Sequence, residues 1–364
     1  MAEKIRCLEE YNSDKTTKVV GPLRVTAESF TEYPLIHEKL ADNEEVGIPL
    51  SADHEPGIYT CVNRGAKFSR QVGGGVNVYI ASDFMTRAPV LEAPTVRRGL
   101  ELAAYINKNH HELKEIAEST TRFGKVHSIK PYNFSKDVHI RLAMQCGDAA
   151  GHNMTTKAGT ALAKYLVEKF PELKYGSDSG NMCTDKKAAA INALTGRGHS
   201  ALTEIVIPRR TVETVLKTTP ELLARLDTKK NKEGGFKAGT LFSANAHYAN
   251  IAAAIYDATG QDLANVVEAS FGGNQIDITH EGDLFFSTNQ PCIIVGTIGS
   301  GKTGPSTRKS LETLGCLKEG KQNGYNSQRF AAMIAAATAM GELSLLADQT
   351  KSGRLIEAHE KIER

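Results

Sequence analysis

Residues 179–187, with the sequence SGNMCTDKK, combine a turn of small residues, a carboxylate and two adjacent lysines, and they lead into an Ala-rich segment that is predicted to be helical. Two ammonium groups beside a helix N-terminus are locally unfavourable because the helix dipole is positive there. We therefore expect Lys186 or Lys187 to have a negative partner elsewhere, such as a carboxylate, a phosphate or a developing oxyanion. The alternative is a solvated surface loop, since lysines are mostly exposed.

Four titratable residues from different parts of the chain could act together on a carbonyl group. Glu55 lies in HEPGIYT, Lys186 in the turn above, Asp262 in ATGQD, and His359 near the C-terminus. A lysine would stabilise an oxyanion, a carboxylic acid would donate a proton, and a histidine would protonate a leaving thiolate. The alternative is that the two carboxylates are turn residues and the histidine is exposed on a helix, because such side chains usually lie at the surface.

The sequence GTIGSGKT at residues 296–303 fits the phosphate-binding loop pattern GxxxxGK[ST], and a short apolar strand is predicted before it. This pattern raises a nucleotide triphosphatase or kinase as an alternative function. The residues that follow are predicted to be helical, and they contain no apolar strand that ends in a Mg²⁺-binding Asp. Contact between Lys302 and a phosphate of a cofactor or of CoA is a further interpretation.

The composition is that of a globular protein without an extended basic surface. The chain has 364 residues, of which 40% are hydrophobic, and its 44 basic and 42 acidic residues give a net charge of +2. None of the six cysteines forms a CxxC pair, the N-terminus is charged, and no apolar run approaches the roughly 18 residues of a transmembrane helix. We expect a cytoplasmic protein that binds no nucleic acid, membrane or metal ion.

Hydrophobic periodicity predicts a compact unit at residues 89–177 inside a larger domain. Residues 92–118 and 156–170 have helical spacing, whereas 126–131 and 138–144 alternate as strands do. Residues 1–90 are predicted to be loops and short strands. The later helices and strands are expected at 202–207, 212–217, from 220, at 245–259 and at 292–295, followed by a long helix capped by Ser327 that ends near Asp348 and a short helix at 355–362.

Ten segments resemble, in order, the signature segments of the 3-hydroxy-3-methylglutaryl-CoA (HMG-CoA) reductase family. They comprise EPGIYTCVNRG, FMTRAP, TRFGKV, GDAAGHNM, SGNMCTDKKAAAIN, NAHYANI, ATGQD, VGTIGSG, GELSLLA and RLIEAH, and the resemblance as a whole covers about residues 20 to 362. The resemblance implies a four-electron reduction of HMG-CoA to mevalonate and CoA with two NAD(P)H. It further implies that Glu55, Lys186, Asp262 and His359 are catalytic, with Asp262 hydrogen-bonded to Lys186 and His359 protonating the CoA thiolate.

The resemblance also assigns binding residues. For the substrate these are Arg87, Ser179, Asn181, Lys187, Lys230, His247 and Asn250, with Asn63 and Arg64 on CoA. For the cofactor they are Asp148, Ala150, His152, Asn153 and Asp185, together with Arg122, which matches an arginine that faces the 2′-phosphate of NADPH. NADPH is the expected cofactor and NADH the alternative, while CoA enters as part of the substrate.

The implied fold is α+β, and the chain resembles a divergent, class I-like member of the family. A large mixed helical and strand substrate-binding domain (1–88 and 178–364, with a catalytic loop at 177–189 and a C-terminal flap helix) would hold an inserted ferredoxin-like, non-Rossmann NAD(P)-binding domain (89–177). A homodimer or tetramer with its active site at the subunit interface is expected.

Departures from the family pattern leave a different acyl-CoA as an alternative substrate. Phe242 and Ser243 replace glycines, and His152 adds a possible charge beside the cofactor. A non-catalytic relative on the same scaffold is a third alternative. Retention of all four catalytic positions argues against it.

Overall fold

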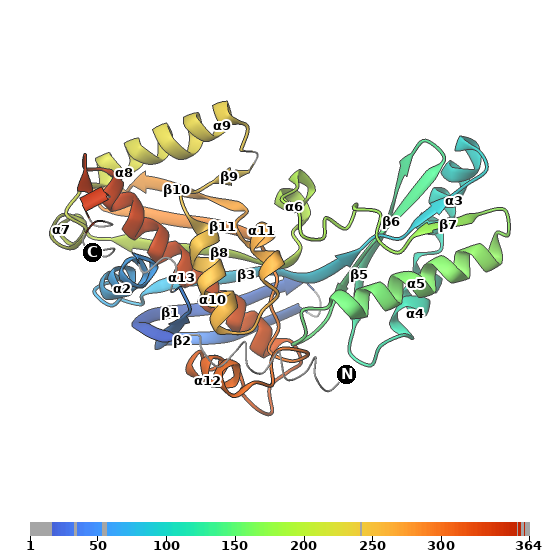
Figure 1. The fold of residues 1–364 in the computed structure, drawn as a ribbon, viewed down its shortest axis with the longest axis horizontal. Coiled ribbons are helices and arrows are strands. Elements are labelled where there is room, and N and C mark those ends of the chain that lie inside the picture. The colour runs from blue at the N-terminus through green and yellow to red at the C-terminus, as the bar shows by residue number, and fades with distance from the viewer. Residues whose placement is uncertain are drawn as a thin grey trace.

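The computed structural model describes residues 17–32, 35–52, 57–240, 242–354, 356, 357 and 360. A mixed sheet of eleven strands runs through a larger part, built around a long central helix, and a smaller part at the other end of the molecule (Figure 1). The strands are β1 (Lys18–Glu32), β2 (Leu35–Leu50), β3 (Val76–Arg87), β4 (Val90–Glu92), β5 (Lys125–Phe134), β6 (Asp137–Gln145), β7 (Lys174–Ser177), β8 (Gly198–Ile207), β9 (Ser243–Ala244), β10 (Gly272–Ile278) and β11 (Leu284–Ile293).

Strand β3 joins the two parts of the sheet, whose order is β7-β4-β6-β3-β8-β11-β10-β9. Residues 77–84 of β3 pair with β8 in the larger part, and residues 85–87 pair with β6 in the smaller part. Strand β1 adds to β3 in parallel, and β2 pairs with β1. Arg87, the last residue of β3, therefore stands where the two parts meet.

The N-terminal region differs from the loops and short strands that the sequence predicted. Strands β1 and β2 form an antiparallel pair of 15 and 16 residues, and the helix α2 (Gly57–Ser69) follows. The pairing shifts register after Val20, after Val25 and again after Ala27. Each irregularity interrupts the period of two by which a strand is recognised in a sequence, so the long strands were hidden from periodicity.

The smaller part has its own hydrophobic core and matches the predicted pattern more closely. Helix α5 (His152–Lys169) and the strands β5 and β6 fall where they were predicted, and they pack with α3 (Val96–Lys108) and α4 (His110–Glu118). The single helix predicted at 92–118 is divided at Asn109, whose backbone is not helical (φ −107°, ψ 34°).

The larger part surrounds α13 (Tyr325–Gln349), which is buried on all sides by helices and strands (Figure 1). Ser327 does not cap this helix, because the N-cap is Gly324. The expected strand at 292–295 is the end of β11, whose pairing with β10 was not predicted. The other helical elements are α6 (Ala190–Thr195), α7 (Arg209–Thr211), η1 (Val212–Leu216), α8 (Pro220–Asp227), η2 (Thr228–Gly234), α9 (Gly235–Ala238), α10 (Tyr248–Ala258), η3 (Leu263–Asn265), α11 (Val266–Ala269) and α12 (Pro305–Thr313).

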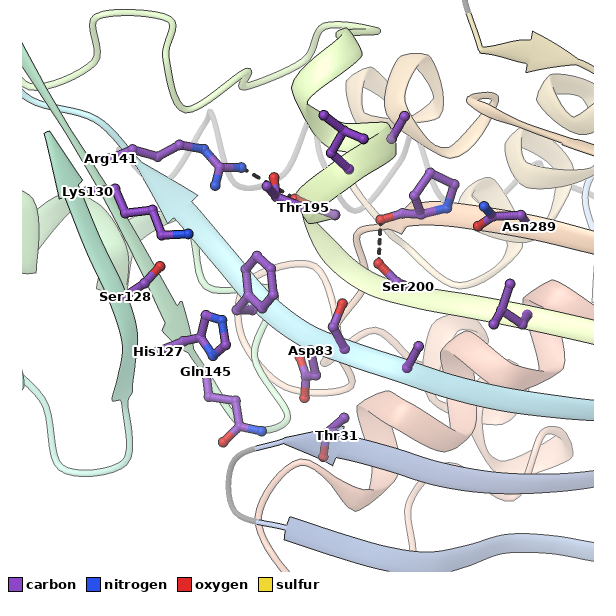
Figure 2. A pocket seen from close by; sticks show the side chains of 18 of the residues that line it. Thr31, Asp83, His127, Ser128, Lys130, Arg141, Gln145, Thr195, Ser200 and Asn289 are labelled. Carbon is purple, nitrogen blue, oxygen red and sulfur yellow. Dashed lines mark hydrogen bonds between the residues drawn. The ribbon is translucent and has the colours of Figure 1, made fainter. Parts of the chain in front are cut away.

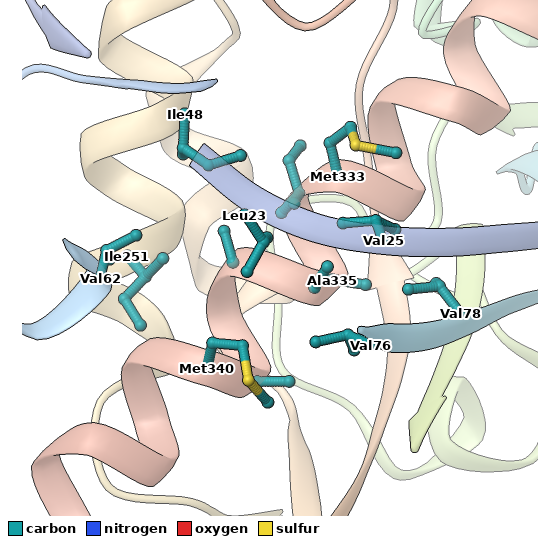
Figure 3. Close-up of a cluster of buried hydrophobic side chains, with 14 of the residues drawn as sticks. Leu23, Val25, Ile48, Val62, Val76, Val78, Ile251, Met333, Ala335 and Met340 are labelled. Atoms are coloured by element: carbon teal, nitrogen blue, oxygen red, sulfur yellow. The ribbon is translucent and has the colours of Figure 1, made fainter. Parts of the chain in front are cut away.

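Helix α13 is also the one described helix that is long and apolar enough to cross a membrane, contrary to the expectation that no such run exists. Of its most apolar window, 94% is buried inside the protein. Its side chains Met333, Ala335 and Met340 contact apolar residues of β1, β2, β3 and α2, including Val25 and Val62 (Figure 3). This burial accounts for the apolar composition of the helix.

The close contact of Gly65 in α2 with the central helix leads to a prediction about stability. A Cβ atom on Gly65 would lie 2.5 Å from the backbone oxygen of Met340. We expect Gly65→Ala to lower the free energy of unfolding by about 1–3 kcal/mol because two backbones must separate. Gly73→Ala is the matched control, since a Cβ there meets no atom within 4 Å. Urea denaturation of both variants measures the difference, and equal stability of the two would contradict the prediction.

Candidate active site

Lys186 and Asp262 form an ion pair, with the ammonium nitrogen 2.9 Å from a carboxylate oxygen. Lys186 lies in the turn before α6 with φ of +58°, and Asp262 is the N-cap of η3. The hydrogen bond from Lys186 to Asp262 raises the pKa of the lysine. Burial, the largest single influence, favours the neutral form of Asp262, but the hydrogen bonds from Lys186 and from the backbone N–H of Ala264, together with the charge of Lys186, lower the pKa of the carboxyl. Both groups stay charged at neutral pH, and the expected negative partner for a lysine of this turn is confirmed.

Asp185, the residue before the lysine, binds two arginines and lies beside His152. Its carboxylate accepts hydrogen bonds from Arg197 at 2.8 Å and from Arg87 at 3.2 Å, and His152 lies 3.7 Å away. Burial opposes its ionisation, but Arg197 and Arg87 together lower the pKa of Asp185. Arg87 also donates to the hydroxyl of Ser179 at 3.3 Å. Four of the predicted site residues are thereby joined in one network.

His152 is neutral at pH 7, which corrects the expectation that it adds a charge. Burial first, and then repulsion by Arg197, lower its pKa below the ordinary value of 6.5. Its Nε2 atom lies 3.3 Å from the side-chain amide of Asn265. An uncharged imidazole in this position donates or accepts hydrogen bonds without altering the charge of the site.

A fully buried ion pair stabilises the turn that carries Lys186. Arg197 and Glu268 have side chains that are 0% exposed, and they are in direct contact. Glu268 also accepts a hydrogen bond of 2.8 Å from the backbone N–H of Lys186, and Arg197 donates to Thr86 at 3.0 Å. Burial raises the pKa of Glu268 to about 7, although the positive charge of Arg197 opposes this. The backbone of the lysine turn is therefore held by a carboxyl group in the protein interior.

Lys186, Asp262 and Asp185 line a cavity of about 760 Å³ between the two parts of the molecule. The predicted catalytic and binding residues that line it are Arg87, Ala150, His152, Asn153, Asp185, Lys186 and Asp262. The first turn of α5 and the loop at 298–302 close the cavity on other sides. The N-terminus of α5 has no side-chain cap, so its first N–H groups face this region without a local acceptor.

A second cavity, of about 410 Å³, lies between β3, β5 and the end of α6. Figure 2 shows His127, Lys130 and Arg141 from the smaller part and Thr195 and Ser200 from the larger part around it. It contains none of the predicted catalytic or binding residues. Of the four predicted catalytic residues, the two that the structure describes, Lys186 and Asp262, line the first cavity.

The remaining cofactor and loop residues lie outside the cavity wall. Asp148 accepts a hydrogen bond of 2.9 Å from the backbone N–H of Ser327, so its carboxylate holds the start of α13. Arg122 is exposed in the turn between α4 and β5. Asn181 has φ of +60° in the catalytic loop, and Lys187 donates to the backbone oxygen of Asp185 at 2.9 Å.

A second group of predicted residues lies elsewhere in the larger part. Arg64 donates to Asp348 and Ser344, and His247 lies 3.1 Å from the backbone oxygen of Gly341, so both are bound to the C-terminal half of α13. Asn250 is exposed in the first turn of α10, and Lys230 is exposed in η2. Asn63 lines a small open depression of about 290 Å³ beside Tyr59. None of these residues lines the cavity beside Lys186.

Glu55 and His359 lie outside the described residues, so their predicted roles stay predictions. Conversely, the structure adds residues that the sequence did not single out. Arg197 and Glu268 support the lysine turn, and Gln261 lines the cavity. No local pattern distinguishes them, because their importance comes from burial and from partners distant in the chain.

An ammonium held by a carboxylate at the wall of a cavity is an arrangement that neutralises a developing oxyanion. A neutral imidazole and an uncapped helix N-terminus at the same wall suit a bound, charged organic ligand. The arrangement is that of an enzyme site suited to reactions at a carbonyl group.

Comparisons with known proteins narrow this class. The family model for hydroxymethylglutaryl-coenzyme A reductase matches residues 19–364. The chain is 40% identical over 330 residues to the 3-hydroxy-3-methylglutaryl-coenzyme A reductase of Pyrococcus horikoshii, covering 90% of this chain and 76% of the relative. It is 41% identical over 347 residues to the reductase of the same name from Aeropyrum pernix, covering 95% and 78%. The chain therefore belongs to the HMG-CoA reductase family, and it reduces HMG-CoA to mevalonate and CoA.

The fold is also that of solved reductases. The class II enzyme of Streptococcus pneumoniae, bound to NADPH in open conformations, aligns with a TM-score of 0.71 at 16% identity, covering 95% of this chain and 89% of that one. At this level of identity the likeness concerns the fold. The expected mixed α+β architecture is confirmed.

The buried Glu268 generates a prediction about pH. Its pKa rises from 4.5, the ordinary value, to about 7 in the folded protein. The folded state therefore binds a proton that the unfolded state has released, and this contribution to stability is complete below 4.5 and is lost as the pH rises through 7. In wild type the free energy of unfolding should therefore fall by at most about 1.4 kcal/mol per pH unit, and Glu268→Gln should remove this fall.

Urea denaturation between these pH values, compared with wild type, measures the effect. The exposed Glu281→Gln is the matched control and should keep the wild-type slope. A Glu268→Gln variant whose stability falls with pH as steeply as that of wild type would contradict the raised pKa.

Proposed function

We propose that the cavity beside Lys186 and Asp262 is the place where the thioester carbonyl of HMG-CoA is reduced. The observation that carries this proposal is the 2.9 Å ion pair at the cavity wall. Because Asp262 raises the pKa of Lys186, the lysine remains an ammonium and acts as a fixed positive charge rather than as a base.

The charge of Lys186 is needed when the carbonyl oxygen becomes negative. Reduction of the thioester gives a hemithioacetal oxyanion, and an ammonium next to that oxygen stabilises it more than it stabilises the neutral thioester. Asp262 orients the ammonium, while the buried Glu268 fixes the lysine backbone. Collapse of the hemithioacetal then releases CoA and mevaldehyde, which is reduced in a second step at the same site.

Two residues outside the described region complete the proposed chemistry. Glu55 is the proposed proton donor, which requires a protonated carboxyl group. His359 is the proposed acid that protonates the CoA thiolate, because an unprotonated thiolate would add back to mevaldehyde. Both roles follow from the family resemblance and from the chemistry that the reaction demands.

NADPH is the proposed cofactor, with NADH as the alternative, and it would supply one hydride to each reduction. The residues present fit such a group, since the uncapped first turn of α5 suits a phosphate and Arg122 is exposed for a 2′-phosphate. Ala150, His152 and Asn153 line the cavity at this turn. The segment 89–177 is proposed to be the ferredoxin-like, non-Rossmann cofactor domain. Its Asp148 acts indirectly, by holding α13.

A homodimer, alone or within a tetramer, is proposed because, in the part of the chain that the structure describes, His247 and Lys230 do not line the cavity beside Lys186. Asp148 is bound at Ser327 and His247 at Glu342 of the same straight helix α13. These attachment points are 15 residues apart, which corresponds to about 22 Å along an α-helix. If the His247 and Lys230 group of one subunit faces the Lys186 group of its partner, both groups contact one substrate. A cytoplasmic location is proposed for this assembly.

The function is tested by following NADPH oxidation with HMG-CoA on the purified protein. Two equivalents of NADPH consumed for each thioester, with mevalonate as product, support the proposal, and replacing NADPH by NADH tests the cofactor preference. Oxidation of a single equivalent, or substrate-independent oxidation, would overturn the assignment of a four-electron reduction to this cavity.

The role of Lys186 predicts a large loss of activity without unfolding. Lys186→Ala should lower kcat by at least about 100-fold, because a donor to the developing oxyanion is removed. Thermal unfolding followed by circular dichroism should remain cooperative. Lys108→Ala, an exposed lysine in the last turn of α3, is the control and should keep wild-type kcat. Turnover by Lys186→Ala near the wild-type rate would show that the mechanism is wrong.

A shared active site predicts complementation between two inactive variants. Lys186→Ala and Lys230→Ala carry defects in the two separate groups, so a mixed dimer retains one site with both wild-type lysines. After unfolding and refolding an equimolar mixture, we expect about one quarter of wild-type activity, because half of the dimers are mixed and each has one intact site. The variants refolded separately are the controls. If the refolded mixture is no more active than the separate variants, the site is built from a single chain.

A further inference from the structure

The phosphate-loop-like segment at residues 296–302 has no assigned role in the reaction, although its last residues line the active-site cavity. The ammonium of Lys302 donates a hydrogen bond to the backbone oxygen of Gly260. The helix that follows, α12, begins only at Pro305. With its ammonium held by the protein backbone, and with the chain belonging to a reductase family, the phosphate-binding-loop alternative has no support.

The same segment holds the turn that carries Asp262 at two further points. The backbone N–H of Gly296 donates to the side-chain oxygen of Gln261 at 3.1 Å. At Gly260, which has φ of +60°, a Cβ atom would lie 2.5 Å from the backbone oxygen of Gly301. The turn at 260–262 therefore lies directly against the segment, and its first two residues are each hydrogen-bonded to it.

Lys302 differs from the other cations around the cavity in the kind of group to which it is bound. Arg87 is paired with Asp185, and Lys186 with Asp262. Lys302 has no carboxylate within 4 Å among the residues that the structure describes, and its hydrogen-bond acceptor is a carbonyl group. A charge-assisted bond to a backbone oxygen in a partly buried position is a strong local restraint.

We propose that Lys302 is a positioning residue for the reductase reaction, which fixes the turn at 260–262 and thereby aims Asp262 at Lys186. This inference rests on the proposed role of Asp262. A glycine turn has high conformational freedom, so an external clamp is needed to keep its carboxylate in place. Displacement of a reacting group by about 1 Å can cost about 100-fold in rate.

The pH dependence of the reaction gives a readout that a purely structural residue would not alter. Burial lowers the pKa of Lys302 to about 8, although the negative charge of Asp262 opposes this. The other charged or titratable groups of the cavity are Lys186 and Asp185 on the catalytic loop, His152 on α5 and Arg87 on β3. As the pH rises through 8, Lys302 loses its proton and the clamp weakens, so kcat should decline on this alkaline limb.

The experiment compares kcat and KM in the HMG-CoA-dependent oxidation of NADPH. Lys302→Met should lower kcat about 10- to 100-fold with little change in either KM, because ground-state binding is not affected. Lys302→Arg should recover most of the activity and move the alkaline limb to higher pH, since a guanidinium stays charged. Lys309→Met, an exposed lysine on α12, is the matched control and should behave as wild type.

Two further variants, Asp262→Asn and the double variant that combines it with Lys302→Met, separate this inference from the proposed function. If Lys302 acts through Asp262, the double variant should be no slower than Asp262→Asn alone, whereas independent roles would multiply the two losses and overturn the inference. A higher KM for NADPH or HMG-CoA with unchanged kcat in Lys302→Met would also overturn it, in favour of direct contact with a phosphate. If Lys302→Met has wild-type activity, the positioning role of Lys302 is rejected and the proposed function is unaffected. If Asp262→Asn has wild-type activity, the proposed role of the ion pair itself is rejected.

Discussion

The proposed active site depends on the contact of the buried Arg197 with Glu268 and Asp185. Arg197 enters from the start of β8, Glu268 from α11 and Asp185 from the catalytic loop, so one guanidinium joins three segments that are far apart in the chain. Glu268 also binds the backbone N–H of Lys186. Removing charges from water costs several kcal/mol for each ion, and only good geometry offsets that cost. The catalytic loop therefore adopts the conformation in which these charges are paired.

The charged groups around the cavity have two different roles. Some fix the structure of the site, and others are exposed to a bound substrate. Arg197 and Asp185 neutralise each other at the base, and burial keeps His152 uncharged. The pair of Lys186 and Asp262 is about half exposed, at 43% and 46%, and so it is accessible to a substrate. A fixed positive charge at the surface of a preorganised wall is suited to a reaction in which negative charge develops on one oxygen atom.

The central helix α13 connects the two groups of site residues without bringing them together. Its N-terminal end is held by Asp148, next to the cavity, and its C-terminal half binds Arg64 and His247. Because the helix is buried on all sides, it acts as a rigid spacer between them. Such a spacer explains why a second subunit is proposed to complete the site, and why the substrate and cofactor residues of one chain need not meet.

The sequence by itself indicated the family and the reaction, because ten segments in order resemble those of one family, and that resemblance implied that Asp262 pairs with Lys186. It also predicted α5, β5 and β6, whose periodicity is regular. It could not predict the bulged strands β1 and β2, whose register shifts break the period of two. Only the tertiary structure decided that Arg197 and Glu268 support the loop, that His152 is neutral, and that Lys302 binds the Gly260 carbonyl. Burial and pairing between distant segments create these properties, and neither is present in any local stretch of the chain.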